Sequence, residues 1–296
     1  MISQVKDDLQ TLLLQVEEKL QSLLQTLSVN EPPLLLEAAS YCLLNPGKRI
    51  RPLLTLCVTQ ALGGSIEEAL IPACAIEILH TYSLIHDDLP CMDDDDLRRG
   101  KPTLHKVYPE GQAVLVGDLL LTMAFEALAV NPLLDSKKSL ELVRILAQKS
   151  GGKGMILGQS LDLAYEGKSL LWEQVQEIHQ RKTGDLISAS LEFGALVAGA
   201  SAETQQILSG VGQKIGLSFQ IIDDLLDLEG EPHLLGKPLH SDLVKQKNTS
   251  VSLLGKDLAR ELAERLLLES LQQCEALGLQ DTLFFHFLPN LVLRSF

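Results

Sequence analysis

A dense acidic stretch, SLIHDDLPCMDDDDLRRGKPT, spans residues 83–103 and places six aspartates within ten residues. Like charges at this spacing repel one another, so an isolated cluster of this kind is unfavourable. Carboxylate oxygens are the ligands of hard divalent cations such as Mg²⁺. Arg98 and Arg99 follow at once, and guanidinium groups bind phosphate through charge-assisted hydrogen bonds. The stretch therefore predicts a magnesium site that binds phosphate.

A second acidic cluster, FQIIDDLLDLEG, lies far downstream at residues 219–230. Asp223 and Asp227 are four residues apart, so a helix projects them from one face. Unpaired carboxylates inside an apolar helix are costly, and ion pairs with a neighbouring helix are a structural alternative. Because both clusters end long apolar helices, we predict two carboxylate pairs that face each other across a cavity.

The first cluster cannot lie on one straight helix. Asp93 is six residues beyond Asp87, which turns it about 240° away around a helix. Pro90 lacks an N–H group and disfavours continued helix. We expect the helix to end near Leu89 and the following loop to return Asp93 to the side of Asp87.

Basic residues accompany the acidic clusters in several short segments. Lys48 and Arg51 lie in PGKRIRP, and Lys182 lies in HQRKTGD. Lys237 and Lys247 lie in GKPLHSDLVKQKNTS. Each alone is typical of a solvated surface charge, but carboxylates together with many Lys and Arg donors are typical of a polyphosphate site. Neither a G-x-x-x-x-G-K-[ST] loop nor a G-x-G-x-x-G turn occurs, which argues against a P-loop or Rossmann nucleotide site.

Three other interpretations of the first cluster compete with a magnesium site. A solvated acidic loop needs no ligand at all. A calcium EF-hand loop with Gly100 at its sixth position fails, because Leu97 would fall on its third ligand position. A metal phosphohydrolase of the HD type could use His86 and Asp87, but it needs further histidines. The other histidines considered lie in unrelated segments or at poor helical spacing: His80, His105, His179 and His240.

Composition limits the class of protein. The 296 residues are 46% hydrophobic and only 4% aromatic, which favours helices. The net charge of −14 argues against nucleic acid or an anionic membrane as the main partner. Residues 113–130 include Asp118 and Glu126, so they predict a buried helix rather than a membrane span. The absence of a signal-peptide pattern and five cysteines without a C-x-x-C pair predict a cytoplasmic protein with reduced core cysteines.

Almost every segment has helical periodicity. An apolar stripe that includes Leu9, Val16 and Leu23 predicts packing of the first helix against a neighbour, with a coiled-coil dimer as the alternative. Further helices are predicted over residues 34–44, 52–62, 67–88, 111–130, 140–151, 172–200, 202–228 and 256–278. The sequence therefore predicts a single all-α domain over residues 1–296 with about ten or more helices.

These motifs resemble those of the trans-isoprenyl diphosphate synthases, and most closely the short-chain bacterial branch that makes farnesyl diphosphate. LIHDDLPCMDDDDLRRGKPT and FQIIDDLLD resemble the family's two aspartate-rich motifs. GKRIRP, GDLLLTMAFEAL, GKGMILGQSLDL and IHQRKTG are also similar and occur in the family's order. The resemblance is dense from about Gly47 to Gly255. It implies a helical bundle of the isoprenoid-synthase type around a central cavity, a homodimer, and three Mg²⁺ ions.

The resemblance also implies roles for individual residues. Two ions would be held by Asp87 and Asp93 and the third by Asp223, with Asp88 and Asp227 in support. The allylic diphosphate would be bound by Arg98, Lys182, Thr183, Gln220 and Lys237. Isopentenyl diphosphate would be bound by Lys48, Arg51, His80 and Arg99, and Lys247 is a further substrate-binding candidate. Catalytic roles are implied for Lys182, Thr183, Gln220, Asp88 and Asp227.

The implied reaction suits these residue types. Magnesium and cations stabilise the departing diphosphate, so that the allylic C–O bond ionises to a carbocation. The alkene of isopentenyl diphosphate attacks C1 and a proton is then lost to the leaving diphosphate, so no protein nucleophile is required. Apolar helix walls must exclude water. Squalene-type coupling and a non-catalytic subunit of a heteromeric synthase are alternatives, although such a subunit should have lost one aspartate motif.

Product length can be predicted from the residues that precede Asp87. Ser83 is one helical turn from that carboxylate, and Tyr82 is one residue further. In the family an aromatic residue there goes with a fifteen-carbon product, so Tyr82 implies farnesyl diphosphate. Ordinary core packing of Tyr82 and a geranylgeranyl product are the alternatives.

Some segments depart from the family pattern. Gln246 precedes Lys247 where Gly is frequent, and a common Tyr-Pro is replaced by Ser250 and Val251. Asp185 follows KTG where a small or apolar residue is usual, so we expect a lower diphosphate affinity on that wall. The C-terminal segment lacks the familiar tail, so no role is assigned to Arg294.

Overall fold

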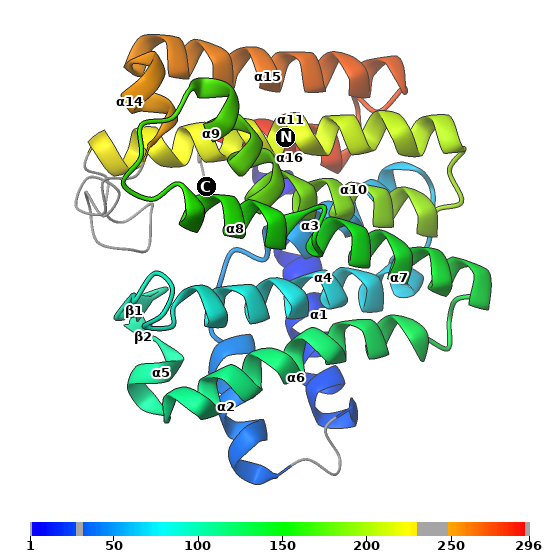
Figure 1. Ribbon diagram of the computed structural model, residues 1–296. Coiled ribbons are helices and arrows are strands. Elements are labelled where there is room, and N and C mark those ends of the chain that lie inside the picture. Colours follow the sequence, from blue (N-terminus) through cyan, green and yellow to red (C-terminus); the bar gives the residue numbers. More distant parts are fainter. Residues whose placement is uncertain (1, 28–31, 230–247, 294–296) are drawn as a thin grey trace.

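The chain folds as an almost entirely helical bundle, as its sequence predicts (Figure 1). The computed structural model describes residues 2–27, 32–229 and 248–293. The helices are α1 (Ile2–Leu27), α2 (Pro33–Leu43), α3 (Ile50–Ala61), α4 (Ile66–Asp87), α5 (Leu104–Val107), α6 (Glu110–Ala129), α7 (Ser136–Ser150), α8 (Met155–Ala164), α9 (Trp172–His179), the π-helical turn η1 (Gln180–Gly184), α10 (Asp185–Val197), α11 (Ala202–Glu229), α14 (Ser250–Leu254), α15 (Lys256–Ala276) and α16 (Leu283–Leu293). Within the described residues, the strands form one antiparallel hairpin of β1 (Leu97–Arg98) and β2 (Lys101–Pro102).

Helix starts follow ordinary capping chemistry. The Ser65 side chain accepts a hydrogen bond from the Glu68 N–H at the start of α4, where acidic residues also suit the helix dipole. Asp135 caps α7 by accepting hydrogen bonds from the N–H groups of Lys137 and Lys138, each at 2.9 Å. These local signals fix where the long helices begin, and tertiary packing then sets their arrangement.

α10 lies at the centre of the bundle and contacts α3, α4, α7 and α11. Most of its side chains are buried, and Phe193 is fully enclosed. Its close approach to α3 requires Gly194, because a Cβ atom there would lie 2.5 Å from the backbone oxygen of Thr55. Burial of each large apolar side chain contributes about 1.5–3 kcal/mol. The core around α10 therefore supports both helices that carry the aspartate clusters, α4 and α11.

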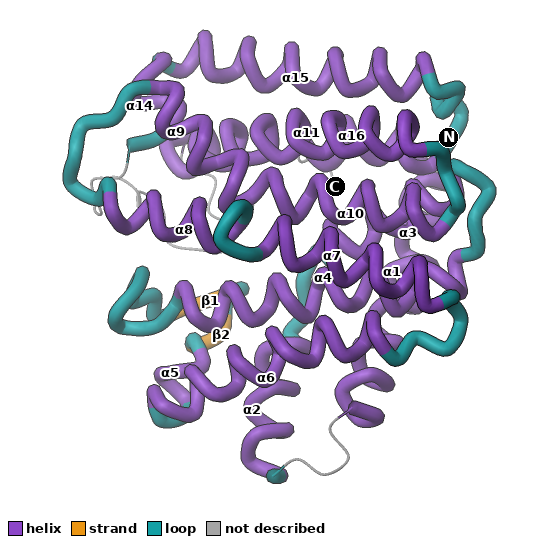
Figure 2. Tube along the Cα trace, turned by 45° about the vertical axis from the view of Figure 1, so that its right-hand side comes forward, coloured by secondary structure: helices purple, strands orange, loops and turns teal. Residues whose placement is uncertain are grey.

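α4 and α11 have their C-terminal ends at the same end of the bundle. In Figure 1 both ends lie on the left, with the hairpin beside the end of α4 and α14 beside the end of α11. The rotated view agrees (Figure 2). η1 contacts both α8 and α11, which brings the KTG segment to the same layer as the second aspartate cluster. The fold thus gathers the predicted motifs at one end of the molecule.

Two helices, α4 and α6, are long and apolar enough to cross a membrane by length and composition. In α4, 78% of the most apolar window is buried inside the bundle, as expected for a core helix. In α6 that share is only 44%. The sequence-based expectation of a buried helix over residues 113–130 is therefore correct for one face of α6, whereas its other face is exposed and includes Leu115.

The remaining sequence-based expectations are mostly confirmed. The stripe of α1 packs within the bundle, with Val16 and Leu23 buried and α4 as a neighbour. The helix expected over residues 172–200 is divided by η1, and α5, α8, α14, α16 and the short hairpin were not predicted. All five cysteines are free, but Cys91 is exposed in the aspartate loop, so the expectation of core cysteines is wrong for this residue.

Candidate active site

The loop after α4 returns the chain to the end of that helix. α4 ends at Asp87, two residues earlier than expected, and the Asp93 N–H donates a hydrogen bond to the Asp87 carbonyl at 2.8 Å. Asp94 adopts a left-handed backbone with φ of 49°, and its N–H donates to the Leu89 carbonyl at 3.1 Å. The predicted return of Asp93 to the side of Asp87 is thereby confirmed for the backbone.

The hairpin after this loop positions two adjacent arginines. Arg99 and Gly100 form its two-residue turn, and both have positive φ, as a type I′ hairpin turn requires. Arg98 donates hydrogen bonds to Asp88 through Nε at 2.9 Å and through a terminal nitrogen, and it also pairs with Asp95 at 2.9 Å. Burial raises the pKa of Asp88 to about 6, although Arg98 acts to lower it. Arg98 therefore lies against the predicted metal site.

Three of the residues assigned to isopentenyl diphosphate gather around a buried carboxylate. Glu77 on α4 is 1% exposed, and its Oε1 lies 3.7 Å from a guanidinium nitrogen of Arg99. Burial, followed by the nearby charge of Arg51 and Arg99, lowers the pKa of His80 well below its ordinary value, so its imidazole is neutral at pH 7. Burial lowers the pKa of Arg51 to about 10, with Glu77 opposing that shift. The grouping of Arg51, His80 and Arg99 fits an anion site.

Another arginine, Arg49, anchors this group and was not identified from the sequence. Its side chain is fully buried and pairs with Glu77 at 3.0 Å and with Glu17 of α1 at 2.7 Å. Arg49 has a left-handed backbone with φ of 45° and directly precedes α3. The residue before it, Lys48, is exposed, and the residue after it, Ile50, is half-buried. The signal that could have identified Glu77 is a single charge within the apolar run IPACAIEIL, because such a charge requires a buried partner.

A second group of predicted residues lies on η1 and α11, which contact each other. The Thr183 hydroxyl donates to the side-chain amide oxygen of Gln220 (Oε1) at 3.1 Å, and Lys182 pairs with Asp162 of α8 at 2.8 Å. Gly158 allows α8 to approach η1, because a Cβ atom there would lie 2.3 Å from the Lys182 backbone nitrogen. The structure thus brings Lys182, Thr183 and Gln220 together, and it adds Asp162, which sequence reasoning missed.

The carboxylates of the second aspartate cluster lie on different faces of α11 and have different surroundings. Asp224 is buried and accepts hydrogen bonds at 2.8 Å from both the backbone N–H and the hydroxyl of Ser250. It also accepts from the Gln220 amide at 3.2 Å, so Asp224 ties α11 to α14 and positions Gln220. Burial raises the pKa of Asp224. Asp223 and Asp227 share another face of α11, where Asp223 is half-buried and Asp227 is buried.

The residues assigned to product length lie on α4 toward α6. Tyr82 is buried, and its ring packs edge-on against His86 with a centroid separation of 5.3 Å. A ring nitrogen of His86 lies 3.1 Å from the Val114 carbonyl of α6. The Ser83 hydroxyl donates to the His80 carbonyl at 2.8 Å. Tyr82 thus occupies the contact between α4 and α6 beneath the aspartate loop.

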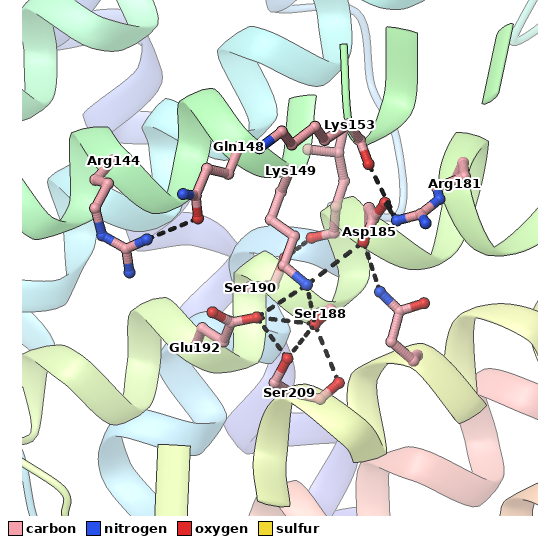
Figure 3. Close-up of polar contacts among 12 residues, drawn as sticks. Arg144, Gln148, Lys149, Lys153, Arg181, Asp185, Ser188, Ser190, Glu192 and Ser209 are labelled. Atoms are coloured by element: carbon pink, nitrogen blue, oxygen red, sulfur yellow. Dashed lines mark hydrogen bonds and ion pairs between the residues drawn. The ribbon is translucent and has the colours of Figure 1, made fainter. Parts of the chain in front are cut away.

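Asp185 does not lie where the sequence suggested. It is 3% exposed, and its carboxylate accepts a hydrogen bond from Gln213 of α11 at 2.6 Å and lies 3.4 Å from Lys149 of α7 (Figure 3). Gln213 is seven residues, about two helical turns, before Gln220 on α11. The charge of Asp185 is therefore buried and paired away from the contact of Thr183 with Gln220. The expected effect of Asp185 on diphosphate affinity stays a prediction.

The donor set of the aspartate clusters fits magnesium. Mg²⁺ uses one or two carboxylates, keeps several waters and shares phosphate oxygens, so it needs no all-protein cage. Among the described residues, no three His, Cys, Asp or Glu side chains are close enough to form such a cage. Asp87 and Asp93 on one wall and Asp223 on the other are the residues that could hold metal together with a diphosphate. Lys237, His240, Gln246, Lys247 and Arg294 lie outside the described residues.

Comparison with known proteins gives consistent results. The family model described as "Polyprenyl synthetase" matches residues 32–277. A farnesyl diphosphate synthase of Bacillus subtilis is 40% identical over 272 residues, covering 91% of this chain and 92% of that protein. A chloroplastic geranylgeranyl pyrophosphate synthase of Catharanthus roseus is 44% identical over 247 residues, covering 83% of this chain and 69% of the plant protein.

Solved structures agree over nearly the whole chain. The geranyltransferase from Legionella pneumophila has a TM-score of 0.88 at 34% identity, covering 99% of this chain and 98% of that one. A geranyltransferase from Helicobacter pylori, complexed with magnesium and isoprenyl diphosphate, has a TM-score of 0.79 at 40% identity and covers 94% of this chain and 95% of its own. Neither an EF-hand nor a histidine-based phosphohydrolase accounts for these similarities.

Proposed function

The chain belongs to the polyprenyl synthetase family, and on that premise we propose that it is a magnesium-dependent prenyltransferase that makes farnesyl diphosphate. Its substrates are isopentenyl diphosphate and an allylic diphosphate, either dimethylallyl or geranyl. The observation that carries the proposal is the arrangement of two carboxylate-bearing helix ends, α4 and α11, at one end of the bundle beside two separate groups of cations. Each of the two groups of cations binds one of the two diphosphates.

The allylic diphosphate is held where the two aspartate clusters meet η1. Asp87, Asp93 and Asp223 would hold the magnesium, three ions by the family pattern, and the bound metal would supply positive charge to the departing diphosphate. Lys182 and Arg98 add positive charge, and Thr183 with Gln220 supplies hydrogen bonds. These groups stabilise charge that develops as the allylic C–O bond breaks.

Isopentenyl diphosphate is held by the group around Glu77. Arg51 and Arg99 provide fixed positive charge, and Lys48 lies exposed on the preceding loop. Neutral His80 can donate or accept a hydrogen bond without competing for the proton that the condensation releases. Glu77 lies 3.7 Å from Arg99 and therefore helps to hold this cation in position for the second diphosphate. The released proton passes to the leaving diphosphate.

The position of Tyr82 supports a fifteen-carbon product. Tyr82 is buried five residues before Asp87 and packs edge-on against His86, which in turn contacts Val114 of α6. A geranylgeranyl product is the second candidate, because proteins named for that product are as similar as those named for farnesyl diphosphate. Incubation of the pure protein with isopentenyl diphosphate, each allylic starter and Mg²⁺, followed by chromatography of the products, decides between them.

The same assay tests whether the chain is a catalyst at all. Formation of farnesyl diphosphate that stops on chelation of magnesium supports the proposal. No product from any allylic starter would overturn it in favour of a non-catalytic subunit. A product joined head to head without isopentenyl diphosphate would instead favour squalene-type coupling.

The proposal includes a homodimer. The outer face of α6 exposes Leu115 at 56%, and less than half of the most apolar window of this helix is buried within the chain. A second copy that packs against this face would bury that apolar surface. Light scattering with size-exclusion chromatography should give twice the chain mass of 32.4 kDa, and Leu115→Asp should yield the monomer. A cytoplasmic location is also proposed, since the free cysteines suit a reducing compartment.

A further inference from the structure

The backbone of η1 depends on a hydrogen bond from Asp185. Its N–H donates to the Gln180 carbonyl five residues earlier, which is the π-type bond that closes the turn. Lys182 and Thr183 lie inside this turn. The widened turn changes where their side chains point relative to a continuous α-helix. Any force that holds Asp185 in place therefore also holds the two diphosphate-binding residues in place.

The side chain of Asp185 is fixed by three other elements (Figure 3). Lys149 of α7 lies 3.4 Å away, Gln213 of α11 donates at 2.6 Å, and Arg181 lies 3.6 Å away. The Arg181 guanidinium also donates to the Lys153 carbonyl at 3.0 Å. One residue thus connects η1 to both neighbouring long helices.

The ammonium of Lys149 is shared with a second carboxylate. Glu192 of α10 lies 3.2 Å from it, and the Ser188 hydroxyl accepts a hydrogen bond from it at 3.1 Å. Ser209 of α11 donates to Glu192 at 2.7 Å. Lys149 and Arg181 balance the charges of Asp185 and Glu192. This arrangement, the Lys149–Asp185–Glu192 network, pairs its opposite charges internally, although the buried Asp185 Oδ2 makes no hydrogen bond and lies 3.6 Å from Arg181.

We propose that the Lys149–Asp185–Glu192 network is a positioning device that fixes the π-turn of η1, and through it the Lys182 and Thr183 contacts to the allylic diphosphate. The inference rests on the proposed function, because it specifies which of the two diphosphates the network affects. The isopentenyl diphosphate group around Glu77 lies on α3, α4 and the hairpin, and the contacts described for the network do not include those elements. The network therefore acts on one substrate and leaves the other unaffected.

Two substitutions each remove one charge of the network while keeping most of the side-chain shape. Asp185→Asn keeps an acceptor for Gln213 but removes the charge opposite Lys149, and Lys149→Met removes the ammonium while keeping most of the side-chain volume. We expect each to raise the KM for the allylic diphosphate about tenfold, at the lower end of what loss of an outer supporting contact costs at a site. The KM for isopentenyl diphosphate should change less than about twofold. Lys149→Arg should restore most of the lost affinity.

Controls separate positioning from folding. Lys137→Met removes a charge from an exposed position of the same helix, α7, and it should leave both KM values unchanged. Circular dichroism and thermal unfolding identify variants that fail to fold. Because Lys149 and Asp185 act as a unit, the double variant should lose no more than about the larger of the two single losses.

A binding measurement tests the inference without turnover. Calorimetric titration with inorganic pyrophosphate and Mg²⁺ should show about tenfold weaker binding to Asp185→Asn than to the wild type. Equal affinity in a folded variant, or KM changes of the same factor for both substrates, would show that the network is only structural. If the wild type makes no prenyl diphosphate, the proposed function fails, whereas the pyrophosphate comparison still decides the role of Asp185.

Discussion

Substitution of Glu77 by Gln should weaken both the fold and the binding of one substrate. Glu77 is almost fully buried, pairs with Arg49 at 3.0 Å and lies 3.7 Å from Arg99. Gln keeps the shape and one acceptor oxygen but removes the negative charge. Arg49 retains its bond to Glu17, whereas Arg51 and Arg99 lose the buried charge that faces them.

The size of the stability effect follows from the burial of this pair. Removal of one partner of a buried ion pair costs about 3–5 kcal/mol, and the remaining contact of Arg49 with Glu17 places Glu77→Gln near about 3 kcal/mol. The unfolding entropy is about 2.1 cal/mol/K per residue. For 296 residues, a loss of about 3 kcal/mol lowers the melting temperature by about 5 °C. The KM for isopentenyl diphosphate should rise about tenfold, equivalent to about 1.4 kcal/mol.

Steady-state kinetics with each substrate varied in turn, together with thermal unfolding, measure these effects. Glu17→Gln is the matched control, because Glu17 pairs with Arg49 and is one third exposed. It should lower the melting temperature less and leave both KM values near those of the wild type. A Glu77→Gln variant that melts like the wild type, or that raises the KM of the allylic diphosphate equally, would refute the assignment of this group to isopentenyl diphosphate.

Three further substitutions test the floor of the cavity, the helix contacts and the pH dependence. Tyr82→Ala should lengthen the prenyl products seen by chromatography, and an unchanged product distribution would contradict its assignment. Gly216→Ala places a Cβ atom 2.4 Å from the Gly184 Cα atom, so urea unfolding should show that the free energy of unfolding falls by about 1–3 kcal/mol. The control is Gly210→Ala on the same helix, whose Cβ atom would meet no atom within 4 Å and should not destabilise the protein. Because the pKa of His80 is lowered, the unfolded chain gains a proton below pH 6.5 that the folded chain does not, and stability falls by up to about 1.4 kcal/mol per pH unit. His80→Gln should reduce this slope between pH 5 and 7, and an unchanged slope would disprove the effect.

The fold class and the backbone path of the first acidic cluster could be predicted from the sequence, because both depend on local patterns. Helical periodicity identified most of the long helices, and Pro90 was enough to predict that Asp93 returns to Asp87. The π-turn could not be predicted in this way. Its closing hydrogen bond differs from an α-helical one by a single residue, and tertiary contacts, such as that of Gly158 with the Lys182 backbone, accompany it.

Supporting residues were missed for a related reason. Arg49 and Asp224 lie within the motifs GKRIRP and FQIIDDLLD but received no role, and Glu77 lies outside the motifs. The roles of all three depend on buried contacts with distant segments. Asp185 was noticed as unusual, but its contacts with Lys149 and Gln213 were not predicted, because sequence spacing does not reveal which side chains of α7 and α11 meet it. The residues assigned to substrate were thus easier to identify than the residues that contact them from distant segments.

The location of the aspartate clusters explains why the site should bind cations strongly. Asp87 is the last residue of α4, and Asp223 and Asp227 lie in the last two turns of α11. The C-terminal end of a helix carries partial negative charge, so carboxylates are disfavoured there and cations are favoured. Arg98, in strand β1 of the hairpin, pairs with Asp88 and Asp95 and so neutralises part of this negative charge. The fold therefore places these carboxylates near the C-terminal ends of two helices, where the carboxylates and the helix ends together favour a divalent ion that arrives with a diphosphate.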